Sequence, residues 1–137
     1  MNALNAGLLS KLAGGTALTT LIGGTASPRI YHMQAPEGAT LPYAVFSISG
    51  GGDENFTQHR TKNLVIFARA YSGVSAAQAG TIDGQIDSLL HNQVLNVTGW
   101  TSVYTVREQD VETIENAPGG SPVYMQGGLY RVVIDKN

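Results

Sequence analysis

Cysteine is absent from the 137-residue sequence, and charged residues are scarce. The lack of cysteine excludes a disulfide framework, a thiolate zinc site and a cysteine nucleophile. Asp, Glu, Lys and Arg make up 13% of the residues, against roughly 25% in typical soluble domains. We therefore expect other subunits to cover part of the surface, although a surface rich in Gly, Ser and Thr would also stay soluble with few charges.

An excess of positive charge and a long apolar run are missing as well. The net charge of −2 disfavours a nucleic-acid-binding surface, because such binding requires clustered Lys and Arg. The first residues, MNALNAGLLSKLAGG, contain no basic segment and only interrupted apolar stretches, so we expect neither a signal peptide nor a membrane span. The length fits one domain over residues 1–137, with a core that needs no metal or disulfide.

Catalytic and metal-binding motifs are not recognisable. His32, His59 and His91 form no HxxxH or HxH pair, and no serine lies in a G-x-S-x-G elbow. The run from Gly50 to Asp53 is followed by no Lys-Ser/Thr and opens no helix, unlike a phosphate-binding loop. We therefore expect no catalytic residue, no metal and no cofactor. A small hydrolase would need a polar pocket that these residues do not assemble.

The stretch from Arg29 to Ser49 is predicted to anchor a β-sheet. It contains a short strand, Arg29–Met33, and a longer one, Tyr43–Ser49. Pro36 and Pro42 between them lack an amide donor and bias the preceding residues toward extended backbone, so this connection cannot be helical. Neither face of the longer strand is strongly polar, which is typical of a central strand covered on both sides.

A second strand of this kind, Leu64–Tyr71, is predicted downstream. Helices can cover one face of such a sheet, and the other face requires the rest of the chain or a neighbouring subunit. The connecting segment Gly50–Asn63 is polar, begins with glycines and is long for a hairpin connection. We predict an antiparallel pair whose far end projects as an arm, with Phe56 as an apolar contact near its tip. A loop without fixed structure is the alternative.

Helical segments are predicted on both sides of these strands. The first contains leucines at helical spacing and ends at a Gly-Gly pair, and a shorter helix follows over Ala17–Ile22. The central helix, residues 75–91, begins with a capping box formed by Ser75 and Gln78. Gly80 and Gly84 inside it cost helix propensity, which indicates close approach to a strand or to another subunit, or a tolerated cost.

The last third of the sequence is predicted to supply the remaining strands. We expect strands at Val94–Val97, at Trp100–Arg107 and, as one or two pieces, over Val123–Ile134. Gly127-Gly128 predicts a tight hairpin or a bulge, and Glu108–Pro122 is predicted to be a loop. The fold class is therefore α+β: a single domain with a mostly antiparallel sheet packed against an N-terminal helix and a longer central helix, with a projecting hairpin arm.

One cluster of charge stands out, at Glu108, Asp110, Glu112 and Glu115. Alternate spacing would place the first three on one side of an extended segment. A solvated loop is the ordinary explanation. A surface that repels DNA is the sharper one, because several copies in a ring would multiply the field.

The order of these segments resembles the tail terminators, the small tail-completion proteins of long-tailed phages and prophages. The resemblance rests on the Leu-rich first helix with its Gly-Gly break, on RIYHMQAPEGATLPYAVFSI and LVIFARAYS, and on the helix SAAQAGTIDGQIDSLL. It covers residues 3–95 and is looser downstream. No single motif is diagnostic, so the specificity lies in the ordered combination.

The resemblance implies a structural virion protein that is made in the host cytoplasm and forms a ring, expected to be hexameric. In the family this ring caps the head-proximal end of the tail tube, ends tube polymerisation and docks to neck proteins, while DNA passes through the lumen without specific binding. We expect contacts to a neighbouring subunit or the tube from Gly50, Gly51, Gly52, Asp53, Phe56, His59, Arg60 and Lys62. Glu108, Asp110 and Glu112 are expected to face the lumen. The competing hypothesis is a head-side neck adaptor or stopper.

Overall fold

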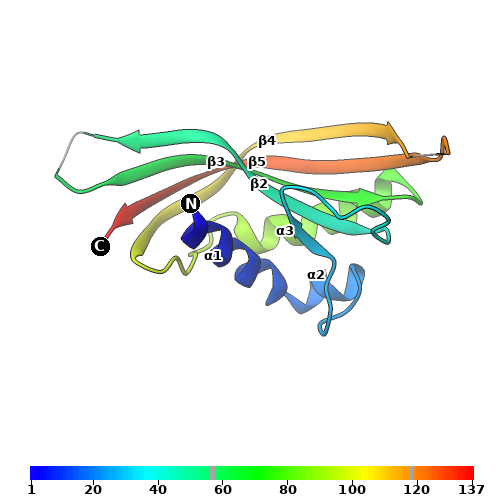
Figure 1. Cartoon of the computed structure of the whole chain (residues 1–137), viewed down its shortest axis with the longest axis horizontal. Helices are drawn as coiled ribbons and strands as arrows, with labels where there is room; N and C mark the ends of the chain where they lie inside the picture. Colours follow the sequence, from blue (N-terminus) through cyan, green and yellow to red (C-terminus); the bar gives the residue numbers. More distant parts are fainter. Residues whose placement is uncertain (56–57, 118) are drawn as a thin grey trace.

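The computed structural model describes residues 1–55, 58–117 and 119–137. In this part of the chain, a five-stranded sheet of order β1-β2-β3-β5-β4 has three helices gathered on one side (Figure 1). The β1–β2 pair is parallel and the other pairs are antiparallel. The elements are α1 (Asn2–Ala13), α2 (Thr16–Leu21), β1 (Ile30–His32), β2 (Tyr43–Glu54), β3 (Thr61–Ser72), α3 (Ala76–Leu90), β4 (Trp100–Asn116) and β5 (Pro122–Lys136). The predicted α+β class, with its N-terminal and central helices, is confirmed.

The central helix α3 begins where its capping box predicts. The backbone N–H of Gln78 donates to the Ser75 side chain over 3.1 Å, which satisfies one of the free donors of the first turn. Gly15, between α1 and α2, allows close packing on α3, because a Cβ there would lie 2.4 Å from a methyl carbon of Leu89. Gly80 lies against the Gln126 side chain, and a Cβ at Gly84 would meet no atom within 4 Å.

The core lies between the helices and one face of the sheet. Its largest fully buried side chains include Phe46 of β2, Ile66 of β3 and Tyr130 of β5, and α3 contributes Ile82 and Ile86. Burial of each such side chain stabilises the fold by about 1.5 to 3 kcal/mol relative to exposure. The helices therefore pack against only one face of the sheet. No helix within the described ranges is long and apolar enough to cross a membrane.

The strand predicted at Val94–Val97 is wrong. The described residues of this segment form only an isolated bridge between Val97 and Trp100. The segment instead crosses α1, where a Cβ at Gly7 would lie 2.5 Å from the Asn96 carbonyl oxygen. Leu95 and Val97 enter the core from this crossing segment, so their apolar pattern reflects burial without strand pairing.

The loop predicted over Glu108–Pro122 is also wrong. β4 continues to Asn116 and pairs with β5 from Pro122 onward, so that a second long hairpin forms. β4 is an edge strand, and its distal half runs from Glu108 to Asn116. Its side chains there are mostly exposed, and the apolar alternation that marks a half-buried strand is therefore missing from the sequence.

Gly127 and Gly128 form neither a hairpin nor a bulge, and both lie inside continuous β5. A Cβ at Gly127 would lie 2.7 Å from that of Arg69, and a Cβ at Gly128 would lie 2.5 Å from the Arg107 guanidinium carbon. The two glycines make room for two arginine side chains on opposite faces of the sheet. The bulges lie in the neighbouring strand β4, one of them between Arg107 and Gln109.

Candidate assembly surfaces

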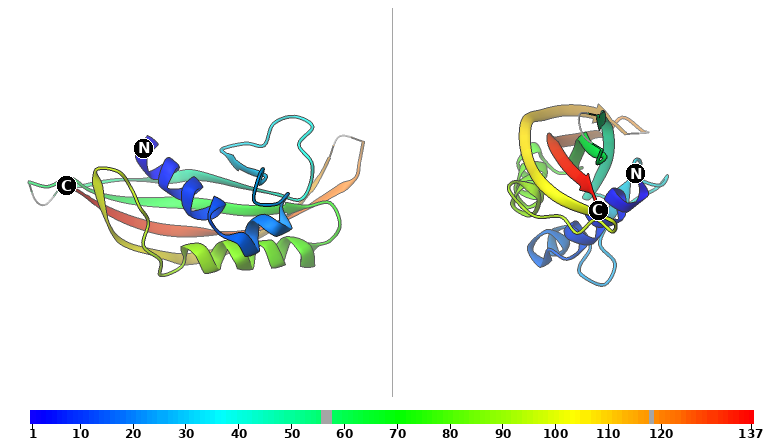
Figure 2. Two further views of the ribbon diagram at one scale, coloured as in Figure 1. Left: turned by 90° about the horizontal axis from the view of Figure 1, so that it is seen from below. Right: turned by 90° about the vertical axis from the view of Figure 1, so that its left-hand side faces the viewer.

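Two hairpins extend from opposite ends of the long, curved sheet (Figure 2). One is the arm formed by the end of β2 and the start of β3, which pair from Gly50–Val65 to Glu54–Thr61. The other is the distal part of β4 and β5, from Asp110–Gly128 to Asn116–Pro122. An antiparallel arm over the Gly50–Asn63 segment is thereby observed. Its predicted anchor Phe56 lies outside the described residues.

The glycines of the arm adjust the path of β2. A bulge between Ile48 and Gly50 shifts the pairing with β3. Gly51 has φ of +104°, and a Cβ there would lie 2.3 Å from the Asn63 carbonyl oxygen, so this position requires glycine. Gly50 and Gly52 are exposed, and a Cβ at either would meet no atom within 4 Å. These two positions therefore present bare backbone.

The charged residues of the arm pair largely with one another. Lys62 donates a hydrogen bond to Asp53, and Arg60 lies 3.2 Å from the same carboxylate. The hydrogen bond from Lys62 is the main reason why the pKa of Asp53 lies below its ordinary value. The Arg60 side chain remains 61% exposed, and His59 is an exposed neighbour near the tip. Of the two predicted cationic contacts, Arg60 is thus the more accessible.

A belt of hydrogen bonds crosses four strands at the base of the arm. Asn63 donates to Glu54 over 2.7 Å and accepts from Arg131 over 2.7 Å. Arg131 also donates to Glu108 over 2.7 Å. The belt lies on the face opposite the helices, because Arg131 alternates with the buried Tyr130 and Val132. It ties the arm to the bulge of β4.

The predicted alignment of three acidic residues on one side of β4 is wrong. The extra residue in the β4 bulge is Glu108, which bonds to Arg131 on the face away from the helices. Asp110 and Glu112 lie on the helix face, where Asp110 accepts a hydrogen bond from Arg107. Residues 108–130 contain four carboxylates and no Lys or Arg, so this end of the molecule is acidic.

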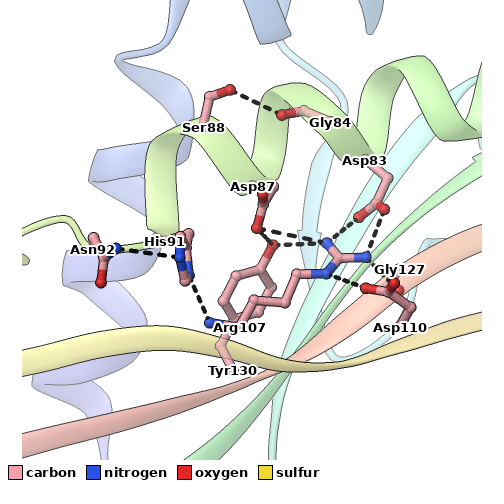
Figure 3. A network of polar contacts seen from close by, with 10 residues as sticks. All are labelled: Asp83, Gly84, Asp87, Ser88, His91, Asn92, Arg107, Asp110, Gly127 and Tyr130. Atoms are coloured by element: carbon pink, nitrogen blue, oxygen red, sulfur yellow. Dashed lines mark hydrogen bonds and ion pairs between the residues drawn. The ribbon is translucent and has the colours of Figure 1, made fainter.

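A buried polar network connects the acidic end to α3 (Figure 3). Arg107 donates two hydrogen bonds to Asp83, of 2.9 and 2.8 Å, and a third, of 2.7 Å, to Asp110. It also donates to the Tyr130 hydroxyl and to the Gly127 carbonyl, each over 2.9 Å. Such a bidentate pair fixes both position and orientation. Arg107 therefore holds α3 against β4 and β5.

The electrostatics of this network follow from its hydrogen bonds and its burial. The side chains of Arg107 and Asp83 are 14% and 11% exposed. Hydrogen bonding to Asp83 raises the pKa of Arg107, and burial raises the pKa of Tyr130. The partners Asp83 and Arg107 are 24 positions apart and share no motif, so no sequence pattern identified the pair. The sequence feature that points to this network is the spacing of Asp83 and Asp87, which places two carboxylates on one face of the helix.

The sheet face opposite the helices has no helix over it in the described chain. Along β3, side chains alternate between buried and half-buried, and the half-buried ones include Phe67, Arg69 and Tyr71. Arg69 stacks on Phe67 at 4.5 Å and donates to the Tyr71 hydroxyl over 3.0 Å. No group of three or more His, Cys, Asp or Glu among the described residues is arranged to hold a metal ion.

Comparison with known proteins identifies the family of the chain. A family model described as Tail completion protein gp17 matches residues 6–118. No curated protein matches the sequence. A chain in the solved structure "Virion of native gene transfer agent (GTA) particle" has the same fold, with a TM-score of 0.73 at 13% identity, over 98% of this chain and 96% of that one. The predicted resemblance and the expectation of a structural role are confirmed by the family match: the chain belongs to the Tail completion protein gp17 family, which is structural and not enzymatic.

Proposed function

We propose that this tail completion protein forms a ring, expected to be hexameric, on the head-proximal end of the tail tube. There it ends polymerisation of the tube protein and offers the surface that joins the tail to the neck. The observation that carries the proposal is the family match over residues 6–118. Membership of a tail completion family makes the protein a component of the virion tail.

The form of the molecule supports assembly with other subunits. The helices cover one face of the sheet, and the opposite face carries half-buried aromatic and apolar side chains such as Phe67 and Tyr71. Surfaces of this kind are typical of protein contacts. The arm reaches beyond the body of the subunit, where Arg60 is exposed and Gly50 and Gly52 present bare backbone. We propose that it contacts a neighbouring subunit or the tube.

The acidic end of β4 is proposed to lie toward the lumen through which DNA passes. Glu108 pairs with Arg131 and Asp110 with Arg107, so of these three carboxylates Glu112 would present the unpaired charge that DNA meets. Copies arranged in a ring would add their fields and keep DNA from binding.

Mixing the purified protein with tail-tube subunits tests the proposal. A terminator is expected to shorten the tubes as its concentration rises, because each capped end stops growing. A neck adaptor or stopper on the head side would leave the tube length unchanged. Tubes of unaltered length at an excess of the protein would therefore contradict the terminator function and favour the adaptor.

A further inference from the structure

Apart from the outer edge of the three-residue strand β1, two stretches of strand edge lie open among the described residues. At one side of the sheet, β1 pairs with β2 only from Ala44 to Phe46, so the outer edge of residues 47–54 is open. At the other side β4 is the edge strand. Asn92 donates to the Thr105 carbonyl and His91 accepts from the Arg107 N–H, so the residues after α3 cover the first half of β4. Residues 108–116 form the second open edge.

We infer that the open β2 edge of one copy pairs with the open β4 edge of the next copy, so that one sheet continues from subunit to subunit. This inference rests on the proposed ring and names the contact that would close it. Open edges present unpaired N–H and C=O groups and readily accept another strand. Neither stretch contains Pro, which would remove an N–H that strand addition needs.

The direction of the strands suits this contact. Successive antiparallel pairings link β2 to β3, β3 to β5 and β5 to β4, so β2 and β4 run in opposite directions. A second copy placed beside the first would bring β2 and β4 together as an antiparallel pair. Because the two edges are different surfaces, the contact is heterologous, and such contacts generate rings when the rotation closes.

The backbone groups that point outward can be assigned on β2. Ala44 donates to Arg29 and the Phe46 carbonyl accepts from Met33, so even-numbered residues of β2 point their N–H and C=O groups away from β3. The bulge after Ile48 shifts this alternation by one residue, so that Gly51 points outward. Gly51 pairs with the buried Leu64 and therefore lies on the helix face of the sheet.

The same reasoning applies to β4. Thr105 and Arg107 point their backbone groups outward, and the bulge at Glu108 shifts the alternation to Asp110 and Glu112. Glu112 pairs with Gln126, which bonds to the Ala76 carbonyl at the start of α3. Glu112 therefore lies on the helix face, as Gly51 does. On both edges, the residues whose N–H and C=O groups point outward are those on the helix face, so the two strands can pair with their helix faces on the same side.

Side chains and charge favour this pairing over β4 with β4. Two β4 edges would bring their carboxylates together, since residues 108–116 carry four and no cation. The β2 edge presents Gly50 and Gly52, where an approaching strand meets no side chain. Its two carboxylates, Asp53 and Glu54, already bond to Lys62 and Asn63, and the partly exposed Arg60 lies beside Asp53.

Cysteine cross-linking tests the pairing, since the chain has no cysteine of its own. Protein with Gly50→Cys is mixed, before assembly with tube protein, with single variants at 111, 113 or 115, whose side chains share the face of Gly50. Variants Glu112→Cys and Ile114→Cys, on the other face, are the matched controls. Disulfides require a Cα separation of about 4.4 to 6.8 Å, so we expect about tenfold more cross-linked dimer at the best odd-numbered position than at the controls.

The same samples separate the two levels of the proposal. If rings form with no cross-link, or with equal cross-linking yields at odd and even positions, the inferred β2–β4 pairing is wrong and the proposed ring still stands. Absence of rings from the wild-type protein by native mass, alone and on tubes, contradicts the proposed function and this inference with it.

A backbone variant gives an independent test. Glu112→Pro removes one outward N–H and leaves the β4–β5 ladder intact, as edge positions allow. We expect it to lose ring formation while keeping the wild-type melting temperature, and Glu112→Ala, which keeps the N–H, to form rings. Rings of normal stability from the folded Glu112→Pro variant would overturn the inference. If that variant unfolds, the cross-linking yields decide alone.

Discussion

The two hairpin ends of the sheet differ in how they handle charge. In the arm, Lys62 and Arg60 surround Asp53, so its charges are largely paired within the hairpin. The β4–β5 end carries four carboxylates over residues 108–130 and no cation. Arg107 and Arg131 at its base bind two of them, Asp110 and Glu108. Glu112 and Glu115 are exposed and have no ion pair among the described residues.

The two ends therefore differ in what determines their structure: backbone conformation in the arm, and an ion-paired network at the base of the acidic end. The arm owes its path to a bulge and to Gly51, whose φ of +104° and proximity to Asn63 exclude a side chain. The acidic end is held against α3 by the hydrogen bonds of Arg107 to Asp83 and Asp110. Changes in the arm should therefore alter assembly, and changes at the junction of the acidic end should alter stability first.

The largest effect is expected from Arg107→Ala. Loss of the guanidinium leaves Asp83 buried without its partner, and removal of one member of a buried pair typically costs 3 to 5 kcal/mol. We expect the free energy of unfolding, measured by urea denaturation, to fall by about 3 kcal/mol. Because Asp83→Ala removes the stranded charge, the double variant should lose less than the sum of the two single losses. A loss below about 1 kcal/mol in Arg107→Ala would show that the network does not hold the junction.

The next effect is on assembly and concerns the arm tip. Replacement of residues 55–60 by Asn-Gly, a sequence suited to a tight hairpin, should leave a folded monomer that no longer caps tubes. The matched control shortens the other hairpin in the same way at residues 117–121 and should retain capping. Melting temperatures and tube lengths measure the two properties. Normal capping by the arm variant would contradict the proposed role of the arm.

Charge reversal at the acidic end should act on DNA. Rings that carry Glu112→Lys are expected to bind duplex DNA more tightly at low salt, by about tenfold, and to lose the gain as salt rises. Stability should change by less than about 0.5 kcal/mol, since Glu112 is exposed. Glu37→Lys, the same change at an exposed site outside both hairpins, is the control. Equal DNA binding by the two variants would place Glu112 away from the lumen.

The smallest effect is a pH dependence in the arm. The folded-state pKa of Asp53 lies below its ordinary value of 3.8, so its pair with Lys62 stabilises the arm above that pH and is lost as the pH falls through the folded-state pKa. The melting temperature of Asp53→Asn should therefore lie slightly below that of the wild type near neutral pH. The difference should vanish in acid. A difference that persists in acid would assign the effect to packing.

Much of the fold follows from local patterns in the sequence. Tyr43–Ser49 and Leu64–Tyr71 lie within β2 and β3, and Ser75 caps α3, because alternation and capping are encoded by neighbouring residues. The extension of β4 beyond Arg107 could not be predicted in this way. Its strand state comes from backbone pairing with β5, which an exposed, acidic edge strand does not signal in its side chains.

The parts of the candidate surfaces that were missed depend on contacts that are distant in sequence. A side chain at Gly128 would collide with Arg107 on the adjacent strand, and Arg107 is held in place by Asp83 on α3. Glu108 leaves the expected acidic face because of a bulge, which shifts the alternation of every residue after it. Such features are fixed by the packing of whole elements.

The most direct test of the central claim is native mass spectrometry of the purified protein combined with negative-stain images of tube ends. The proposed function predicts a closed ring, with a mass that is an integer multiple of the 14.4 kDa chain, seated at one end of each tube. Tubes whose two ends are alike and free of the protein, at concentrations where the protein is in excess, would contradict it.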